Sequence, residues 1–117
     1  MTKDSKYRAG VIGAGAISQA LHLPGYRKDR RASLVAFADP AVARHKEVLE
    51  AYPRLRAYAD YKEMLRAEDL DVVSVASPNV FHAEQAVAAL RAGCHVLCEK
   101  PIATTLRDAD KMIAASK

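Results

Sequence analysis

Five short apolar runs, separated by segments with helical spacing, are the feature that most limits how this chain can fold. The runs cover residues 7–12, 34–38, 56–58, 72–76 and 95–98. Their length and their β-branched or apolar content favour strands that are buried on both faces of a sheet. Strands that alternate with helices predict a parallel sheet with right-handed crossovers, and the expected strand order is 3-2-1-4-5. The sequence therefore predicts an α/β fold with a doubly wound parallel sheet of the Rossmann type.

The segments between these runs carry signals that begin and end helices. The first helix is predicted to begin at Ala16 and to break or restart near Leu23, because Pro24 lacks an N–H group. Thr105 and Asp108 resemble a capping box that begins the last helix. The residues of that helix predicted to face inward are Leu106, Ala109, Met112 and Ile113. The other helices are expected over residues 41–51 and 61–66, and from residue 79 to a stop at Gly93.

The composition fits one soluble globular domain. Half of the residues are hydrophobic and 27% are charged, which excludes disordered and fibrous classes. A chain of 117 residues typically makes one domain, so residues 1–117 are expected to form a single unit. The start is polar, and no apolar stretch approaches the ~18 residues that span a bilayer. We therefore expect a cytoplasmic protein with no membrane partner.

Charge and cysteine usage exclude further classes. Lys and Arg number 18 against 14 Asp and Glu, a net charge of +4, and the basic cluster over residues 27–31 is predicted to be a solvated turn. Basic residues interleaved with aromatic ones and nucleic-acid-binding motifs are both lacking, so nucleic acid is not an expected partner. Cys94 and Cys98 would lie about 13 Å apart along a strand, too far for a disulfide. Neither has partners that suggest zinc, so we expect two buried thiols and no metal site.

A glycine loop follows the first predicted strand and precedes the first helix. Residues 13–18, Gly-Ala-Gly-Ala-Ile-Ser, match G-x-G-x-x-G except at the last position, where serine is still small enough for close packing. Gly13 permits a tight turn, and Gly15 lets the backbone approach a pyrophosphate. The helix N-terminus at Ala16 and Ile17 offers free N–H groups and a positive dipole. The loop predicts a dinucleotide site, and the alternative is a glycine-rich turn that binds no ligand.

Asp39 ends the second predicted strand, 24 residues after Gly15. A carboxylate at this place can accept hydrogen bonds from the adenosine ribose hydroxyls of NAD, and it would repel the 2′-phosphate of NADP. NAD is therefore the expected cofactor. NADP is the alternative, because Arg44, His45 and Lys46 lie nearby in the sequence. Asp39 could instead, or also, cap the helix that follows.

Two further segments follow the fourth and fifth predicted strands, at the edge where open α/β sheets bind ligands. They consist of Ser77, Pro78 and Asn79 with His82 one turn later, and of Glu99, Lys100 and Pro101. We predict that Asn79 and His82 cap the fourth helix and line the cofactor pocket; the alternative for His82 is a surface position. The alternative for Glu99 and Lys100 is an exposed ion pair at the end of a strand.

Together these pieces resemble the N-terminal domain of the Gfo/Idh/MocA family of oxidoreductases, which includes glucose-fructose oxidoreductase and inositol dehydrogenase. The resemblance covers nearly the whole chain, from about Tyr7 onward. It rests on Gly13-Ala14-Gly15, Asp39-Pro40, Asp71-Val72-Val73, Ser77-Pro78-Asn79 with His82, and the stretch 92–101, Ala-Gly-Cys-His-Val-Leu-Cys-Glu-Lys-Pro. The last stretch is highly specific when it is joined to the others.

The resemblance implies a role for each matched segment. In that family the lysine of the Glu-Lys-Pro motif, here Lys100, reaches the substrate and the nicotinamide. A cation there favours the alkoxide-like charge that develops as hydride leaves. Glu99 would lie by the nicotinamide ribose, and Pro101 would follow a bond that is often cis. His22 could face the substrate, although a structural or solvated histidine is favoured. Lys100 is thus the predicted catalytic residue, and the predicted cofactor-binding residues are Gly13, Gly15, Ala16, Ile17, Asp39, Ser77, Pro78, Asn79, His82, Glu99, Lys100 and Pro101.

The resemblance also implies parts that this sequence lacks. Family members continue into another strand and a larger α/β domain, which carries an acid and a base, shapes the sugar pocket and commonly forms the subunit interface. We therefore expect a domain truncated before its last strand, inactive alone, whose fifth strand could pair with a second copy. The expected function is hydride transfer between NAD or NADP and a secondary hydroxyl or ketone of a sugar, cyclitol or similar molecule. The alternatives are a non-catalytic dinucleotide-binding or sensor module, and a remnant that binds nothing.

Overall fold

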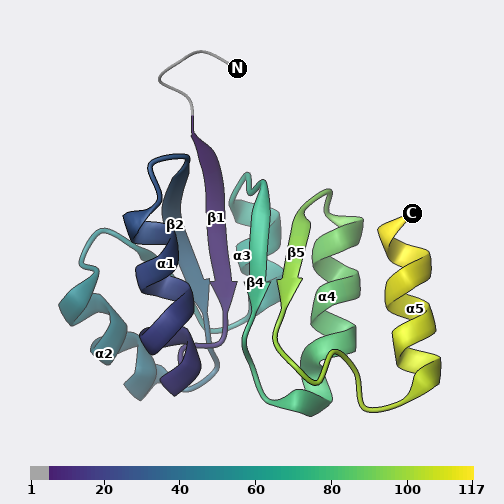
Figure 1. The fold of residues 1–117 in the computed structure, drawn as a ribbon. Helices are drawn as coiled ribbons and strands as arrows, with labels where there is room; N and C mark the ends of the chain where they lie inside the picture. Colours follow the sequence, from purple (N-terminus) through teal and green to yellow (C-terminus); the bar gives the residue numbers. More distant parts are fainter. Residues whose placement is uncertain (1–5) are drawn as a thin grey trace.

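Five parallel strands form one sheet in the order β3-β2-β1-β4-β5 (Figure 1). The computed structural model describes residues 6–117. The strands are β1 (Tyr7–Ile12), β2 (Ala32–Ala38), β3 (Arg56–Tyr58), β4 (Val72–Val75) and β5 (His95–Cys98). Every neighbouring pair is parallel, so the carboxyl ends of the strands meet at one edge of the sheet, the lower edge in Figure 1. The predicted fold class and strand order are confirmed.

Helices cover both faces of this sheet. They are η1 (Ser18–His22) with α1 (Leu23–Lys28), α2 (Val42–Ala51), α3 (Tyr61–Ala67), η2 (Asn79–Phe81) with α4 (His82–Arg91), and α5 (Leu106–Ser116). On one face, Leu23 and Val48 pack with Val11 and Phe37 of the central strands. On the opposite face, a second core unites Ile12 and its neighbours with residues of α3, α4 and α5. The alternation of Val11 and Ile12 between the two cores is the period of two that a strand imposes.

The first helix changes its hydrogen bonding where a break was predicted. Helical structure runs from residue 16 to residue 28, and Ser18–His22 form a π turn in which the Leu23 N–H donates to the Ser18 carbonyl. Pro24 then lies in the first turn of α1, directly after this π turn, and has no N–H to donate to the preceding turn. The chain therefore passes the proline without leaving the helix, and His22 lies in the π turn.

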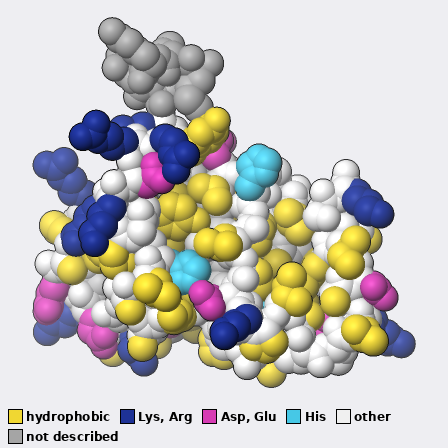
Figure 2. All heavy atoms as spheres, in the orientation of Figure 1, with side chains coloured by type: hydrophobic (Ala, Val, Ile, Leu, Met, Phe, Trp, Pro, Cys, Tyr) yellow, Lys and Arg dark blue, Asp and Glu magenta, His cyan; other side chains and the backbone are white. Residues whose placement is uncertain are grey.

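The last helix is less buried than predicted. Thr105 is its N-cap, because its hydroxyl accepts from the Asp108 N–H at 3.1 Å, and Met112 is buried. Leu106 and Ile113, however, are 85% and 54% exposed, so the prediction that they face inward was wrong. The reason is that α5 packs mainly against α4, which covers only a narrow strip of it. Figure 2 accordingly shows hydrophobic side chains at the surface on the side of the molecule that carries β5, α4 and α5.

The two cysteines are sheltered from solvent, whereas the basic segment is exposed to it. Cys94 and Cys98 are free thiols, the first buried and the second half-buried, and burial raises the pKa of both. The basic residues of the 27–31 segment are exposed, as predicted. Between residues 6 and 117, no helix has both the length and the apolar character needed to cross a membrane.

Candidate functional site

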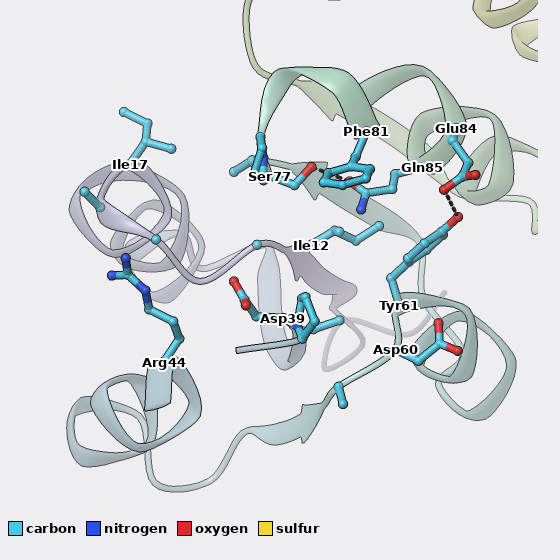
Figure 3. A pocket seen from close by; sticks show the side chains of 18 residues that line it. Ile12, Ile17, Asp39, Arg44, Asp60, Tyr61, Ser77, Phe81, Glu84 and Gln85 are labelled. Atoms are coloured by element: carbon cyan, nitrogen blue, oxygen red, sulfur yellow. Dashed lines mark hydrogen bonds between the residues drawn. The ribbon is translucent and has the colours of Figure 1, made fainter. Parts of the chain in front are cut away.

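A pocket of about 660 Å³ lies at the carboxyl edge of the sheet (Figure 3). Its size falls within the ~300–1,000 Å³ that is usual for small-molecule and cofactor sites. Its walls come from the ends of β1, β2 and β4 and from the segments that follow these strands and β3. The predicted cofactor-binding residues that line it are Gly13, Gly15, Ala16, Ile17, Asp39, Ser77 and Pro78.

The two glycines of the loop are needed for different reasons. Gly13 has a φ of +103°, and a β-carbon there would lie 2.7 Å from the Ala76 carbonyl oxygen, so the fold itself requires glycine. Its N–H donates to the Ala38 carbonyl at 2.7 Å, which fixes the turn to the end of β2. A β-carbon at Gly15 would meet no protein atom within 4 Å, although Gly15 lines the pocket. The missing side chain at Gly15 therefore leaves room for a ligand rather than relieving a clash.

Asp39 ties the loop to the next helix. One carboxylate oxygen accepts from the Ala14 N–H at 2.8 Å, and the other accepts from the Ala41 N–H at 2.8 Å. Ala41 itself is the N-cap residue of α2, so Asp39 supports the helix start from two residues earlier instead of occupying the cap. Because a carboxylate offers about four lone-pair sites, Asp39 keeps acceptor capacity for further donors in the pocket.

Of the three basic residues considered for NADP, Arg44 lines the pocket. It projects from α2 toward the side of the glycine loop (Figure 3) and lies 3.8 Å from Glu47 in an exposed ion pair. His45 turns elsewhere: its Nε2–H donates to the Asp39 carbonyl at 2.6 Å, and its ring packs edge-on against Phe37. Lys46 does not line the pocket.

The pocket wall opposite Arg44 consists of residues that the sequence did not predict as part of the site (Figure 3). It contains Tyr61, whose hydroxyl donates to Glu84 at 3.1 Å; burial, with this bond, raises the pKa of Tyr61 to about 12. Phe81 and Gln85 complete the wall, and Gln85 accepts a hydrogen bond from the Ser77 hydroxyl. Tyr61 follows the short strand β3 closely, so the rule that ligands bind beyond strand ends could have found it. Phe81 and Gln85 carry no such signal.

Asn79 and His82 do not line the pocket, and neither caps α4. The 3₁₀ turn that begins at Asn79 delays α4, so that its N-cap falls at Phe81, and Asn79 is exposed. His82 is only 1% exposed, which also excludes the surface position. Its Nδ1 lies 2.8 Å from the Pro101 carbonyl oxygen, and its Nε2 lies 2.7 Å from the Ser77 carbonyl oxygen. His82 thus joins the two segments that follow β4 and β5.

The Glu99-Lys100-Pro101 segment lies at the end of β5, outside the pocket. The bond between Lys100 and Pro101 is cis, and Lys100 is exposed. Glu99 pairs with His22 rather than with Lys100: the His22 Nε2–H donates to its carboxylate at 2.9 Å and lowers the pKa of that carboxyl. The side chain of His22 is 6% exposed, so a solvated position for this histidine is also wrong.

Fold and site together define a Rossmann-type nucleotide-binding domain, with a glycine loop after β1 and a carboxylate at the end of β2. Residues 7–117 match the model of the Gfo/Idh/MocA oxidoreductase family, described as an NAD-binding Rossmann fold. The chain belongs to this family, and the resemblance found in the sequence is confirmed.

Known proteins agree with this assignment. The chain is 41% identical to the D-glucoside 3-dehydrogenase of Escherichia coli K12, over 92% of its own length and 31% of the enzyme. The WlbA dehydrogenase of Bordetella pertussis, solved with NADH and UDP-GlcNAcA, has a TM-score of 0.89 at 31% identity, covering 96% of this chain and 34% of that one. The 3-ketoreductase KijD10 of Actinomadura kijaniata, solved with NADP and TDP-benzene, has a TM-score of 0.86 at 34% identity, with the same coverages of 96% and 34%. The chain therefore spans about a third of the length of these relatives.

Proposed function

We propose that this chain holds NAD(P) for an enzyme that moves hydride between the cofactor and a secondary hydroxyl or ketone of a sugar-like molecule. The observation that carries the proposal is the convergence of an unobstructed Gly15 and the carboxylate of Asp39 in one pocket. The sugar-like substrate is supported by relatives named for glucosides and inositols.

The loop and Asp39 suit the adenosine and pyrophosphate parts of the cofactor. The N–H groups at the helix start beyond Gly15 face an anion favourably, and Gly15 lets the backbone come close to it. The free acceptor sites of Asp39 would take the two ribose hydroxyls. Asp39 would repel a 2′-phosphate, whereas Arg44, on the same pocket, would attract one. NAD is the proposed cofactor because Asp39 is held rigidly by two backbone bonds, whereas Arg44 is 45% exposed and paired with Glu47.

Lys100 is the proposed catalytic residue. The cofactor, when bound, supplies or accepts the hydride. The exposed ammonium group of Lys100 offers three donors, and it would stabilise negative charge on the substrate oxygen as the C–H bond breaks. Glu99 is engaged with His22, which leaves Lys100 free to contact the substrate.

Binding is tested by calorimetric titration of the chain with NADH and, separately, with NADPH. We expect saturable binding that favours NADH. Gly15→Val should weaken NADH binding at least tenfold and leave the fold intact, since a β-carbon there meets no protein atom within 4 Å and Gly15 lines the pocket. Gly25→Ala is the matched control, because a β-carbon there also meets nothing within 4 Å and Gly25 lies outside the pocket. Equal NADH affinity in the Gly15 variant and the wild type would refute the assignment of the pocket.

Hydride transfer is tested separately, by following NADH formation when NAD is offered with inositols and glucosides to the full-length protein. Lys100→Ala is expected to keep NADH affinity within threefold and to lower the turnover by at least a hundredfold. NADH binding without any substrate-dependent turnover in the wild type would instead favour the non-catalytic sensor.

A further inference from the structure

Two buried histidines contact the Glu99-Lys100-Pro101 segment, one at each end of it. His22 holds the side chain of Glu99, and His82 holds the main-chain carbonyl of Pro101. Lys100, between these two contacts, is exposed. Neither histidine lines the cofactor pocket, so direct ligand contact in that pocket does not account for their burial.

The contact made by His22 joins two segments that are far apart in the sequence. His22 lies in the π turn of the helix that begins at the glycine loop, 77 residues before Glu99 in the chain. The donor belongs to a side chain that is 6% exposed, and the acceptor to one that is 29% exposed. A charge-assisted hydrogen bond that is shielded in this way is stronger and more directional than one in water. The bond therefore fixes the end of β5 relative to the helix that follows the glycine loop.

The contacts of His82 join two loops. Both of its ring nitrogens lie against carbonyl oxygens, those of Ser77 and Pro101, at 2.7 Å and 2.8 Å. Carbonyl oxygens only accept, so either neutral tautomer donates to one of them and the doubly protonated ring donates to both. Ser77 is itself part of the pocket wall. The His82 ring therefore lies between that wall and the segment that carries Lys100, and it contacts both.

The geometry points to His22 and His82 as positioning residues that hold Lys100 in place relative to the cofactor pocket. This inference rests on the proposed function. His22 fixes the segment relative to the helix that follows the glycine loop. His82 fixes it relative to the loop after β4. Removing either one frees the Lys100 segment and removes no side chain that lines the pocket.

The test compares two ligands that share the adenosine and pyrophosphate parts. ADP-ribose lacks the nicotinamide that NADH carries, so it reports on the pocket alone. His22→Leu and His82→Leu are expected to lower the affinity for NADH at least threefold relative to the affinity for ADP-ribose, because the freed segment includes Glu99, which is expected beside the nicotinamide ribose. His22→Gln retains an N–H donor toward Glu99 and should restore most of this ratio. His95→Gln is the matched control, because His95 is an exposed histidine on β5, the strand that leads into Glu99.

A second measurement needs no ligand. Amide hydrogen exchange over residues 98–103 should become at least tenfold faster in the two leucine variants, and remain at the wild-type rate in His95→Gln. A purely structural role would weaken both ligands equally and would speed exchange throughout the fold, and that result would overturn the inference. Unchanged exchange in the segment would overturn it too. If the wild type binds neither ligand, the proposed function fails, and the exchange data alone decide whether the histidines hold the segment. The His22 variants keep the test decisive should His82→Leu fail to fold.

Discussion

At the scale of single residues, Ser18 shows how this loop departs from the glycine motif. Its side chain is fully buried at the position of the third glycine, and within residues 6–117 its hydroxyl is the buried side-chain polar atom left without a hydrogen-bond partner. An unpaired buried hydroxyl costs about 1–3 kcal/mol. Ser18→Ala is therefore expected to raise the free energy of unfolding by about 1 kcal/mol, measured by urea denaturation.

Ser18→Gly is the informative companion to this variant. It also removes the hydroxyl, but it restores the motif at the expense of about 1 kcal/mol of helix propensity relative to alanine. We expect its stability to fall close to that of the wild type and below that of Ser18→Ala. A Ser18→Ala protein less stable than the wild type would show that the hydroxyl makes a favourable bond in solution.

Residue identities in the site were predictable where their reason is local. Gly13 and Gly15 follow a strand and precede a helix, and Asp39 ends the next strand. The neighbouring sequence is therefore enough to predict that all three belong to the site. Gln85 and His82 contact the rest of the site only because α4 packs where it does, and their contacts with Ser77 depend on the turn that precedes that helix. No spacing in the sequence encodes that turn.

At the scale of helices and strands, periodicity predicts the elements well but not which of their faces are covered. All five strands and the helices between them occur close to where the apolar runs and stop signals indicated. Leu106 and Ile113 have the spacing of an inward face, yet they are exposed because the neighbour of α5 is another helix. An apolar stripe on a helix indicates that this face packs against another element, but it does not indicate which element that is.

The π turn at Ser18–His22 is a similar case. The sequence marks Pro24 as an interruption, and a widened helix is one of several ways to accommodate it. The turn sets the position of His22, and with it the contact to Glu99. This is why a histidine that looked solvated or structural in the sequence contacts the side chain of Glu99, the residue before Lys100.

At the scale of the whole molecule, Glu68 connects parts that are distant in the sequence. Glu68 is the C-cap residue of α3, and its side chain is 3% exposed. Its carboxylate accepts from Arg8 of β1 at 3.1 Å and from Arg56 and Tyr58 of β3, each at 2.6 Å. The contact with Arg8 joins residues 60 positions apart, and no local pattern predicts it. A buried carboxylate with this many donors resists protonation, and its effect should appear in the acid stability of the fold.

The pH dependence of unfolding is therefore the last prediction. Hydrogen bonds from Arg56, and then from Tyr58, lower the pKa of Glu68 from 4.5 to about 2 in the folded chain. Because the folded pKa lies below the unfolded one, this contribution is complete above a pH of about 4.5 and is lost as the pH falls toward 2. Since Arg56 is 57% exposed, we discount for solvent screening and expect roughly 2 kcal/mol. Urea denaturation of the wild type and Glu68→Gln should show a stability difference that is largest above pH 5 and shrinks toward pH 2. A difference that stays constant across that range would mean that the carboxylate is not held by these donors in solution.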